Sequence, residues 1–201
     1  MLTFHYRQRF IRARKLLVLL VVMTLANLQI DPLFSTSYAG ERENRRISVA
    51  FKLFPSFLSA DRNLKQKVDA AGKLNLYILY QENQRRAEDL AKRMQERGTL
   101  RRLPIKVASI SLKALAEQRD KPIGGIFIAE PLGDELLKVV SVARSQQVLL
   151  ISPFKGDVDR GATGGISITD RVQPLINMQA LRAAGIELKS FFLRVSKRYG
   201  R

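Results

Sequence analysis

The stretch that decides the fold runs from Leu74 to Ile110 and reads LNLYILYQENQRRAEDLAKRMQERGTLRRLPIKVASI. Its first seven residues are nearly all apolar or aromatic, a composition typical of a buried strand. Residues 84–97 carry opposite charges four positions apart, which supports a helix, and Gly98 is suited to end it. Residues 105–110 then predict a second strand. This strand–helix–strand order predicts a parallel sheet joined by a right-handed crossover.

The same alternation continues along the chain. Ser111 is a good N-cap for a helix that reaches residue 119. Residues 125–129 (GIFIA) and 148–152 (VLLIS) predict two further strands, with a helix over 134–146 between them. Four strands that alternate with helices indicate one α/β domain with a mainly parallel sheet and flanking helices.

The two ends of the domain follow other patterns. Residues 47–58 have apolar residues at helical spacing, and Pro55 should kink or split that helix. After the last parallel strand, residues 165–168 and 172–176 predict a short C-terminal hairpin. Asn177 then caps a long C-terminal helix over 178–199, interrupted by Gly185. The side chains expected to face the sheet from this helix are Leu188, Phe192, Val195 and Tyr199.

The N-terminus reads as a secretory leader. A basic cluster precedes an apolar run of 13 residues from Leu16 to Leu28. The small residues that a signal-peptide cleavage site requires follow it, and the last of them is Ala39. A spanning helix needs about 20 apolar residues. We therefore expect a signal peptide over 1–39, cleaved after Ala39, and a mature domain over 40–201. The alternative is an inner-membrane anchor formed by residues 16–30.

The net charge of the mature domain indicates which classes of partner it can bind. The chain has a net charge of +17, and loss of the leader, with five basic residues and one acid, leaves +13. In the cytosol such a charge favours nucleic acid. In the periplasm the polyanions are lipid headgroups, lipopolysaccharide phosphates and acidic protein surfaces. We expect no nucleic-acid partner, and either an anionic envelope surface or a general basic bias without a specific partner.

The mature domain lacks the side chains that most catalytic sites use. It contains no Cys, and the one His, His5, lies in the leader. Thiolate, Ser-His-Asp and imidazole–metal chemistry are therefore excluded. The glycine-rich stretch 156–165 lacks the Lys of a phosphate-binding loop and the final Glu of a calcium loop. We expect a protein that is not an enzyme and needs no cofactor or metal.

A small ligand, if there is one, should bind in the crevice beyond the carboxyl ends of the parallel strands. Polar and glycine residues follow or flank those strand ends. The candidate crevice residues are Tyr80, Gln81, Ser111, Glu130, Ser152, Gly164 and Gly165.

The C-terminal third carries a specific resemblance. The segment from Ile176 to Arg194 reads INMQALRAAGIELKSFFLR and follows a glycine-rich loop that ends Gly164-Gly165-Ile166. It resembles the closing segment of the YfiR family of small periplasmic regulatory proteins, and the helix over 47–58 is more weakly similar to the first segment of that family. The resemblance implies an exported α/β domain that binds the periplasmic part of a membrane-bound diguanylate cyclase and holds it inactive. This chain lacks the cysteines of some members and replaces the usual Trp-Pro end of the first helix with Ser59-Ala60-Asp61.

The sequence therefore leaves two hypotheses for the function. The first is a periplasmic regulator that contacts an inner-membrane sensor or cyclase; the second is a periplasmic small-molecule-binding component. A hydrolase that uses carboxylates alone is disfavoured, because the acidic residues cluster weakly.

Overall fold

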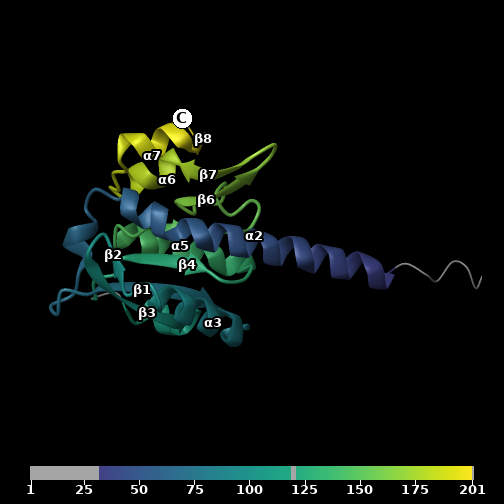
Figure 1. Cartoon of the computed structure of the whole chain (residues 1–201), viewed down its shortest axis with the longest axis horizontal. Helices are drawn as coiled ribbons and strands as arrows, with labels where there is room; N and C mark the ends of the chain where they lie inside the picture. The colour runs from purple at the N-terminus through teal and green to yellow at the C-terminus, as the bar shows by residue number, and fades with distance from the viewer. Residues whose placement is uncertain (1–31, 119–120, 201) are drawn as a thin grey trace, which may run out of the picture. The chain divides into compact units, whose positions relative to one another are not determined.

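The computed structural model describes residues 32–118 and 121–200, so residues 1–31 of the predicted leader lie outside the described residues. Within this part of the chain one eight-stranded sheet has the order β2-β3-β1-β4-β5-β6-β7-β8 (Figure 1). The strands are β1 (Leu74–Tyr80), β2 (Thr99–Leu100), β3 (Leu103–Ser111), β4 (Gly125–Ile128), β5 (Leu150–Ile151), β6 (Gly164–Ile168), β7 (Val172–Asn177) and β8 (Lys197–Tyr199). The helices are α2 (Pro32–Ala60), η2 (Leu64–Lys67), α3 (Gln84–Gln95), α4 (Leu112–Ala116), η3 (Gly133–Glu135), α5 (Leu136–Ser145), α6 (Met178–Ala183) and α7 (Ser190–Val195).

The pairing confirms the predicted α/β class. β1 lies between β3 and β4 and is parallel to both, and β5 and β6 continue the parallel set. β7 turns back against β6 as the predicted hairpin. The chain moves outward from β1 to β3 and then returns to the other side of β1 with β4. The sheet therefore has a topological switch point between the carboxyl ends of β1 and β4.

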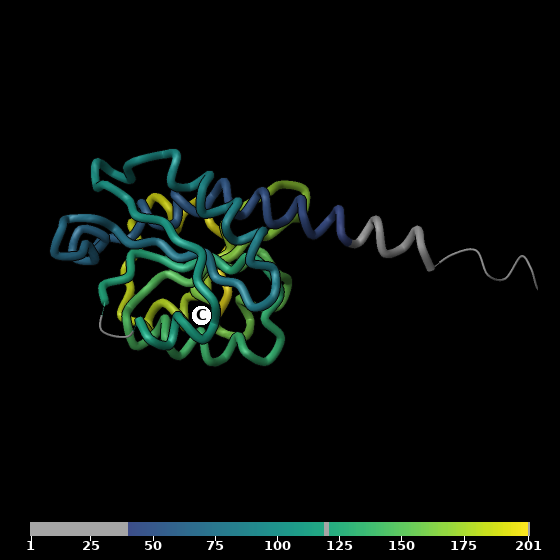
Figure 2. Tube along the Cα trace, turned by 90° about the horizontal axis from the view of Figure 1, so that it is seen from below, coloured from purple at the N-terminus to yellow at the C-terminus, as the bar shows by residue number. Residues whose placement is uncertain are grey.

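Helices cover both faces of the sheet, because side chains alternate along each strand. On β1, Leu76 and Ile78 join a core that also contains buried residues of α2, α3, α6 and α7. Leu79 joins a second core with buried residues of α4 and α5. The result is a three-layer arrangement for residues 43–200, whose chain path is seen from a second direction in Figure 2. No helix within 32–118 and 121–200 has both the length and the hydropathy needed to span a membrane.

Helix α2 passes through Pro55 without interruption, so of the two predicted effects, a kink or a split, the split is wrong. Proline removes one backbone donor from the helix, but the residues around it are firmly packed. The rings of Phe54 and Phe127 lie 5.5 Å apart, and those of Phe57 and Phe192 lie 5.2 Å apart. Burial on both sides of Pro55 therefore holds the helix together.

The predicted long C-terminal helix is wrong. Asn177 does cap a helix, α6, but this ends at Ala183 and Gly185 takes a left-handed φ of 64°. The next residues are extended, and Ile186 and Leu188 are buried at a spacing of two, which is the period of a strand. Helix α7 and strand β8 follow. Phe192 is buried as expected, whereas Val195 and Tyr199 are exposed.

The turn between β2 and β3 is strained. Leu100 pairs with Leu103, so the loop contains only Arg101 and Arg102, with φ values of 50° and 67°. Positive φ at both central residues is the mark of a type I′ turn, which favours Asn-Gly. Each arginine held in this left-handed region costs about 1–2 kcal/mol. β2 was not predicted from the sequence, since its two residues are too few to form a pattern.

Candidate ligand-binding site

The carboxyl ends of the strands bring the predicted crevice residues together in two groups. Tyr80 pairs with Ser111 across β1 and β3, and the Glu130 carboxylate accepts a hydrogen bond from the backbone N–H of Gln81. Tyr80, Gln81 and Glu130 lie at the switch point, and Ser111 lies beside Tyr80 at the end of β3. The second group forms at β5 and β6, where the N–H of Ser152 donates to the carbonyl of Gly164 at 2.9 Å.

At the switch point the chain supplies its own anion. Beyond Gln81, the Glu130 carboxylate also accepts the N–H groups of Glu82 at 2.7 Å and of Asn83 at 3.0 Å. These donors precede α3, where backbone N–H groups and the helix dipole favour negative charge. Burial alone would raise the pKa of Glu130, but the three backbone donors and Arg86 together lower it below its ordinary value. Glu130 therefore supplies the negative charge that the N-terminal end of α3 favours.

The second group is also engaged internally. The buried Ser152 hydroxyl contacts the Asp157 carboxylate and accepts the N–H of Phe154 at 3.1 Å. Burial raises the pKa of Asp157, against the opposing effects of Ser152 and Arg160. Arg46, on α2, donates to the carbonyl oxygens of Pro153 and Ile166 at 2.8 and 3.1 Å. Sequence reasoning missed Arg46, because the pattern of its helix does not show which edge of the sheet it reaches.

The three remaining crevice residues, Ser111, Gly164 and Gly165, have structural roles within the domain. The Ser111 side chain caps α4 by accepting the N–H of Ala114 at 3.3 Å. A Cβ atom on Gly164 would lie 2.8 Å from the Phe57 ring and 2.9 Å from Ile151. On Gly165 it would lie 2.6 Å from the carbonyl oxygen of Ser152. Both glycines therefore permit close packing of the sheet.

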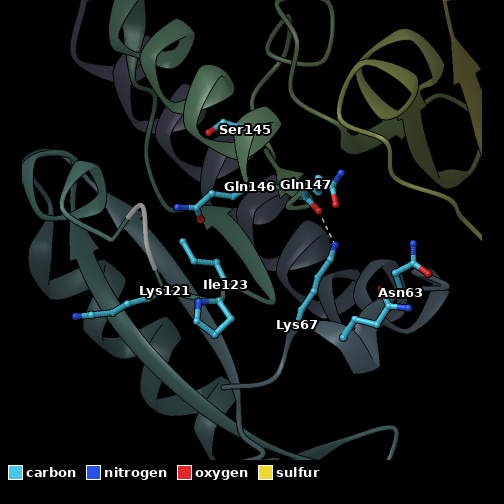
Figure 3. A pocket seen from close by; sticks show the side chains of 9 residues that line it. Asn63, Lys67, Lys121, Ile123, Ser145, Gln146 and Gln147 are labelled. Atoms are coloured by element: carbon cyan, nitrogen blue, oxygen red, sulfur yellow. Dashed lines mark hydrogen bonds between the residues drawn. The ribbon is translucent and has the colours of Figure 1, made fainter. Parts of the chain in front are cut away.

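A pocket of about 400 Å³ lies at the opposite edge, beside the amino ends of β1, β4 and β5 (Figure 3). Three segments of the chain line it: the α2–β1 connection, the residues before β4 and the residues before β5. The lining residues are Asn63, Gln66, Lys67, Lys121, Pro122, Ile123, Ser145, Gln146 and Gln147. The sequence analysis did not identify this pocket, because amide and lysine side chains in short loops form no recognisable motif.

Lys67, which lines the pocket, belongs to a buried ion pair. The Lys67 Nζ lies 2.6 Å from the Asp61 Oδ2 and donates to the carbonyl oxygen of Gln147 at 2.6 Å; Figure 3 shows the second of these bonds. The Asp61 side chain is 1% exposed and also accepts the N–H of Asn63 at 2.9 Å. These contacts fix the α2–β1 connection against the loop before β5.

Only one of the two polar atoms of the Gln146 side chain has a hydrogen-bond partner among the described residues. Its Nε2 donates to the carbonyl oxygen of Gln118 at 3.1 Å. Its Oε1 is buried and has no partner among the described atoms. Such an acceptor is costly unless a donor reaches it. The residues that line the pocket include several amides and two lysines, which suits a small polar molecule.

The described side chains show no arrangement for metal chemistry. Within residues 32–118 and 121–200, no three carboxylate or other metal-binding side chains gather in one place.

Two solved structures are similar to this chain. One is an ABC domain from Streptococcus pneumonia in complex with L-Trp, with 12% identity and a TM-score of 0.46, covering 70% of this chain and 61% of that chain. The other is a substrate binding protein with adhesive properties from Clostridium difficile, with 13% identity and a TM-score of 0.46, covering 63% of this chain and 54% of that chain. The chain thus spans less than two thirds of either protein. No curated protein sequence matches it.

The chain also matches a protein family. A family model described as YfiR/HmsC-like matches residues 63–197, which is more than half of the chain. The match includes β1 through α7 and the C-terminal segment on which the sequence resemblance rested. The chain belongs to the YfiR/HmsC-like family.

Proposed function

We propose that this chain is a periplasmic regulator that acts without catalysis, through contact with the periplasmic part of an inner-membrane signalling protein such as a diguanylate cyclase. The family match carries this proposal. At family level it indicates a periplasmic regulatory protein of cyclic-di-GMP signalling. The absence of Cys from the chain and of His from residues 6–201 is consistent with a role in binding.

Export is part of the proposal. Cleavage after Ala39 would remove the basic and apolar leader and release the domain into the periplasm. A compact unit of the structure begins at Glu43, close to this point. Intact-mass measurement of the protein from the periplasmic fraction tests it: the mature species should begin at Gly40, and a full-length species in the cytosol would contradict export.

Contact with the partner is tested by cross-linking in intact cells, followed by purification of the tagged chain from detergent-solubilised envelopes. We expect a cross-linked species in which the second protein has a periplasmic domain, a membrane span and a cyclase or sensor-kinase domain. An unrelated exported protein with the same tag is the control. Recovery of the chain without such a species would contradict the proposal.

A second function is favoured by the pocket in Figure 3: a periplasmic small-molecule-binding component. The observation behind it is the Oε1 of Gln146, which has no hydrogen-bond partner within the described part of the chain. The crevice at the carboxyl ends stays the other proposed location, with Glu130 as the group a ligand would have to displace. Thermal shift measurements with sugars, amino acids and nucleotides would detect such a ligand, since a ligand at 100 times its Kd adds about 2.7 kcal/mol to the free energy of unfolding. Two variants then distinguish the two locations. Gln146→Leu should abolish the shift for a ligand in the pocket, and Glu130→Gln should alter it only for a ligand in the crevice.

A further inference from the structure

Four exposed apolar side chains lie on two segments near the last strand of the sheet. Ile168 and Val172 pair with each other in the β6–β7 hairpin, and Phe191 and Val195 lie on α7. Each of the four is 45–57% exposed, and only two other large apolar side chains are exposed in the part of the chain that the structure describes. Single exposed apolar residues are common on soluble proteins, whereas a group of them marks an interaction surface.

The hairpin and α7 lie on the same side of the sheet. Because side chains alternate along a strand, Val172 shares its face of β7 with Ile176. Ile176 is buried in the core that also contains Phe192 of α7. The Gln173 Nε2 donates to the carbonyl oxygen of Val195 at 3.4 Å, which joins the beginning of β7 to the end of α7. In Figure 1 the two elements lie side by side at one end of the sheet.

Arginine side chains accompany these apolar residues. Arg194 is exposed on α7 between the two apolar positions, and Arg171 is exposed in the hairpin turn. Arg198, on β8, pairs with a β7 residue whose side chain belongs to the core beneath α7, so it lies on the same face. No carboxylate of the described residues forms an ion pair with any of the three. Asp170 is the one acidic residue of the hairpin, and α7 and β8 contain none.

We infer that this side of the domain binds the surface of a bilayer that contains anionic phospholipid. The lipid-binding face, as we call it, consists of Ile168, Arg171, Val172, Phe191, Arg194, Val195 and Arg198. Apolar side chains insert among the lipid headgroups and basic side chains attract anionic lipid, and the two contributions to binding add.

Other occupants fit this face less well. A second copy of the chain would bring its own arginines against these. An added strand would have to pair with β8, whose Lys197 and Arg198 are charges of the kind that protect exposed sheet edges. An acidic protein would need pockets for its anchoring side chains, but none of the four apolar residues lines the cavities of about 210, 330 and 400 Å³.

The inference rests on the proposed function in one respect, since export would bring the domain to the inner membrane. The binding itself is a property of the folded domain. Vesicle measurements on the protein recovered from the periplasmic fraction therefore test it separately from the contact with a signalling protein.

The first experiment uses the absence of Trp from the chain, because a single introduced Trp reports on its own surroundings. Phe191→Trp places this probe on the lipid-binding face. The control, Leu137→Trp, places it at a position 58% exposed on α5, which packs on the opposite face of the sheet. Each variant is mixed with vesicles of phosphatidylcholine alone or of phosphatidylcholine with phosphatidylglycerol, and fluorescence is measured with and without brominated acyl chains.

With phosphatidylglycerol present, the emission of the Phe191→Trp variant should shift to shorter wavelength and be quenched by the brominated lipid. The emission of the Leu137→Trp variant should change little. No change in the Phe191→Trp variant, or equal changes in both, would overturn the inference.

The second experiment tests the charges. Arg194→Gln/Arg198→Gln should weaken binding to the phosphatidylglycerol vesicles by about tenfold or more in sedimentation, since each basic residue near an anionic surface contributes roughly a fivefold factor. Lys113→Gln/Arg144→Gln removes the same charge from exposed positions of α4 and α5 and should weaken binding by less than about twofold. Equal losses would show a general attraction of the basic domain and would contradict a defined face.

A third comparison separates lipid from protein. If the unchanged protein does not bind the vesicles, and Phe191→Gln removes the cross-link to the membrane protein in cells, the face contacts protein and the lipid inference is wrong. If the vesicles bind as expected but no cross-linked partner is found, the lipid-binding face stands and the regulator proposal fails.

Discussion

Both carboxylate oxygens of Glu130 accept the backbone N–H of Asn83, at 3.0 and 3.1 Å. Asn83 is itself the N-cap of α3, and its side chain accepts the N–H of Arg86. One carboxylate from the end of β4 therefore organises the turn between β1 and α3. In a doubly wound sheet this is the place where ligands bind, and here the chain fills it from within.

Replacement of Glu130 by Ala should lower the free energy of unfolding by about 1–2 kcal/mol, because the backbone donors lose their acceptor. Urea denaturation measures the loss. Glu117→Ala, at an exposed site after α4, is the control and should change little. An equal effect at both positions would show that the Glu130 contacts do not stabilise the turn.

Glu130 also predicts a pH dependence. Its pKa is lower in the folded protein than in the unfolded chain. Its stabilising contribution is therefore complete above the ordinary pKa of a glutamate, about 4.3, and is lost as the pH falls through the lower folded value. Thermal unfolding from pH 6 to pH 2.5 should show a steeper decline for the native protein than for Glu130→Gln. Parallel curves would contradict this assignment.

Asp157 predicts the opposite trend. Burial raises its pKa in the folded protein, so its ionisation opposes folding as the pH rises from the ordinary aspartate value, about 3.9, through the higher folded value. Asp157→Asn keeps an acceptor for the Ser152 hydroxyl and removes the charge. The variant should gain melting temperature relative to the native protein at pH 7 but not at pH 3. A gain of the same size at both values would exclude ionisation as the cause.

The buried pair of Lys67 and Asp61 gives a larger effect. Lys67→Met leaves the Asp61 carboxylate buried without its partner, which costs about 3–5 kcal/mol. Lys65→Met, at an exposed site on the same η2 segment, is the control. The double variant Asp61→Asn/Lys67→Met should recover part of the loss. If Lys67→Met unfolds at the same urea concentration as its control, the pair does not stabilise the α2–β1 connection.

Two neighbouring phenylalanines of α7 test how this helix packs against the domain. Phe192 is 4% exposed and contacts Phe57, whereas Phe191 is 54% exposed. Phe192→Ala should cost about 3–5 kcal/mol, and Phe191→Ala less than about 0.5 kcal/mol. Similar losses in urea denaturation would mean that α7 packs with another face.

The sequence predicted the parallel sheet well, because strands such as Leu74–Tyr80 and Gly125–Ile128 are short apolar runs separated by periodic helices. It failed after Ala183. There the spacing of Leu188 and Phe192 fits a helix, and the competing extended pairing with Ala60 and Arg62 comes from residues over a hundred positions away. The spacing of apolar residues within one segment contains no information about a pairing partner so far away in the sequence.

The candidate site was predictable only in part. The rule for parallel sheets brought Gln81 and Glu130 to the same place, and the structure puts them in hydrogen-bond contact. It could not predict that the Glu130 carboxylate would accept three successive backbone N–H groups. The pocket at the other edge depends on Lys67 and Gln146, whose roles arise from tertiary contacts alone.

The regulatory role is tested most directly by the cellular level of cyclic-di-GMP. Deletion of the gene should raise that level, and expression of the chain with its leader should restore it. The same chain without residues 1–39 should fail to do so, because it stays in the cytosol. An unchanged level after deletion, or equal restoration by the leaderless chain, would contradict the account.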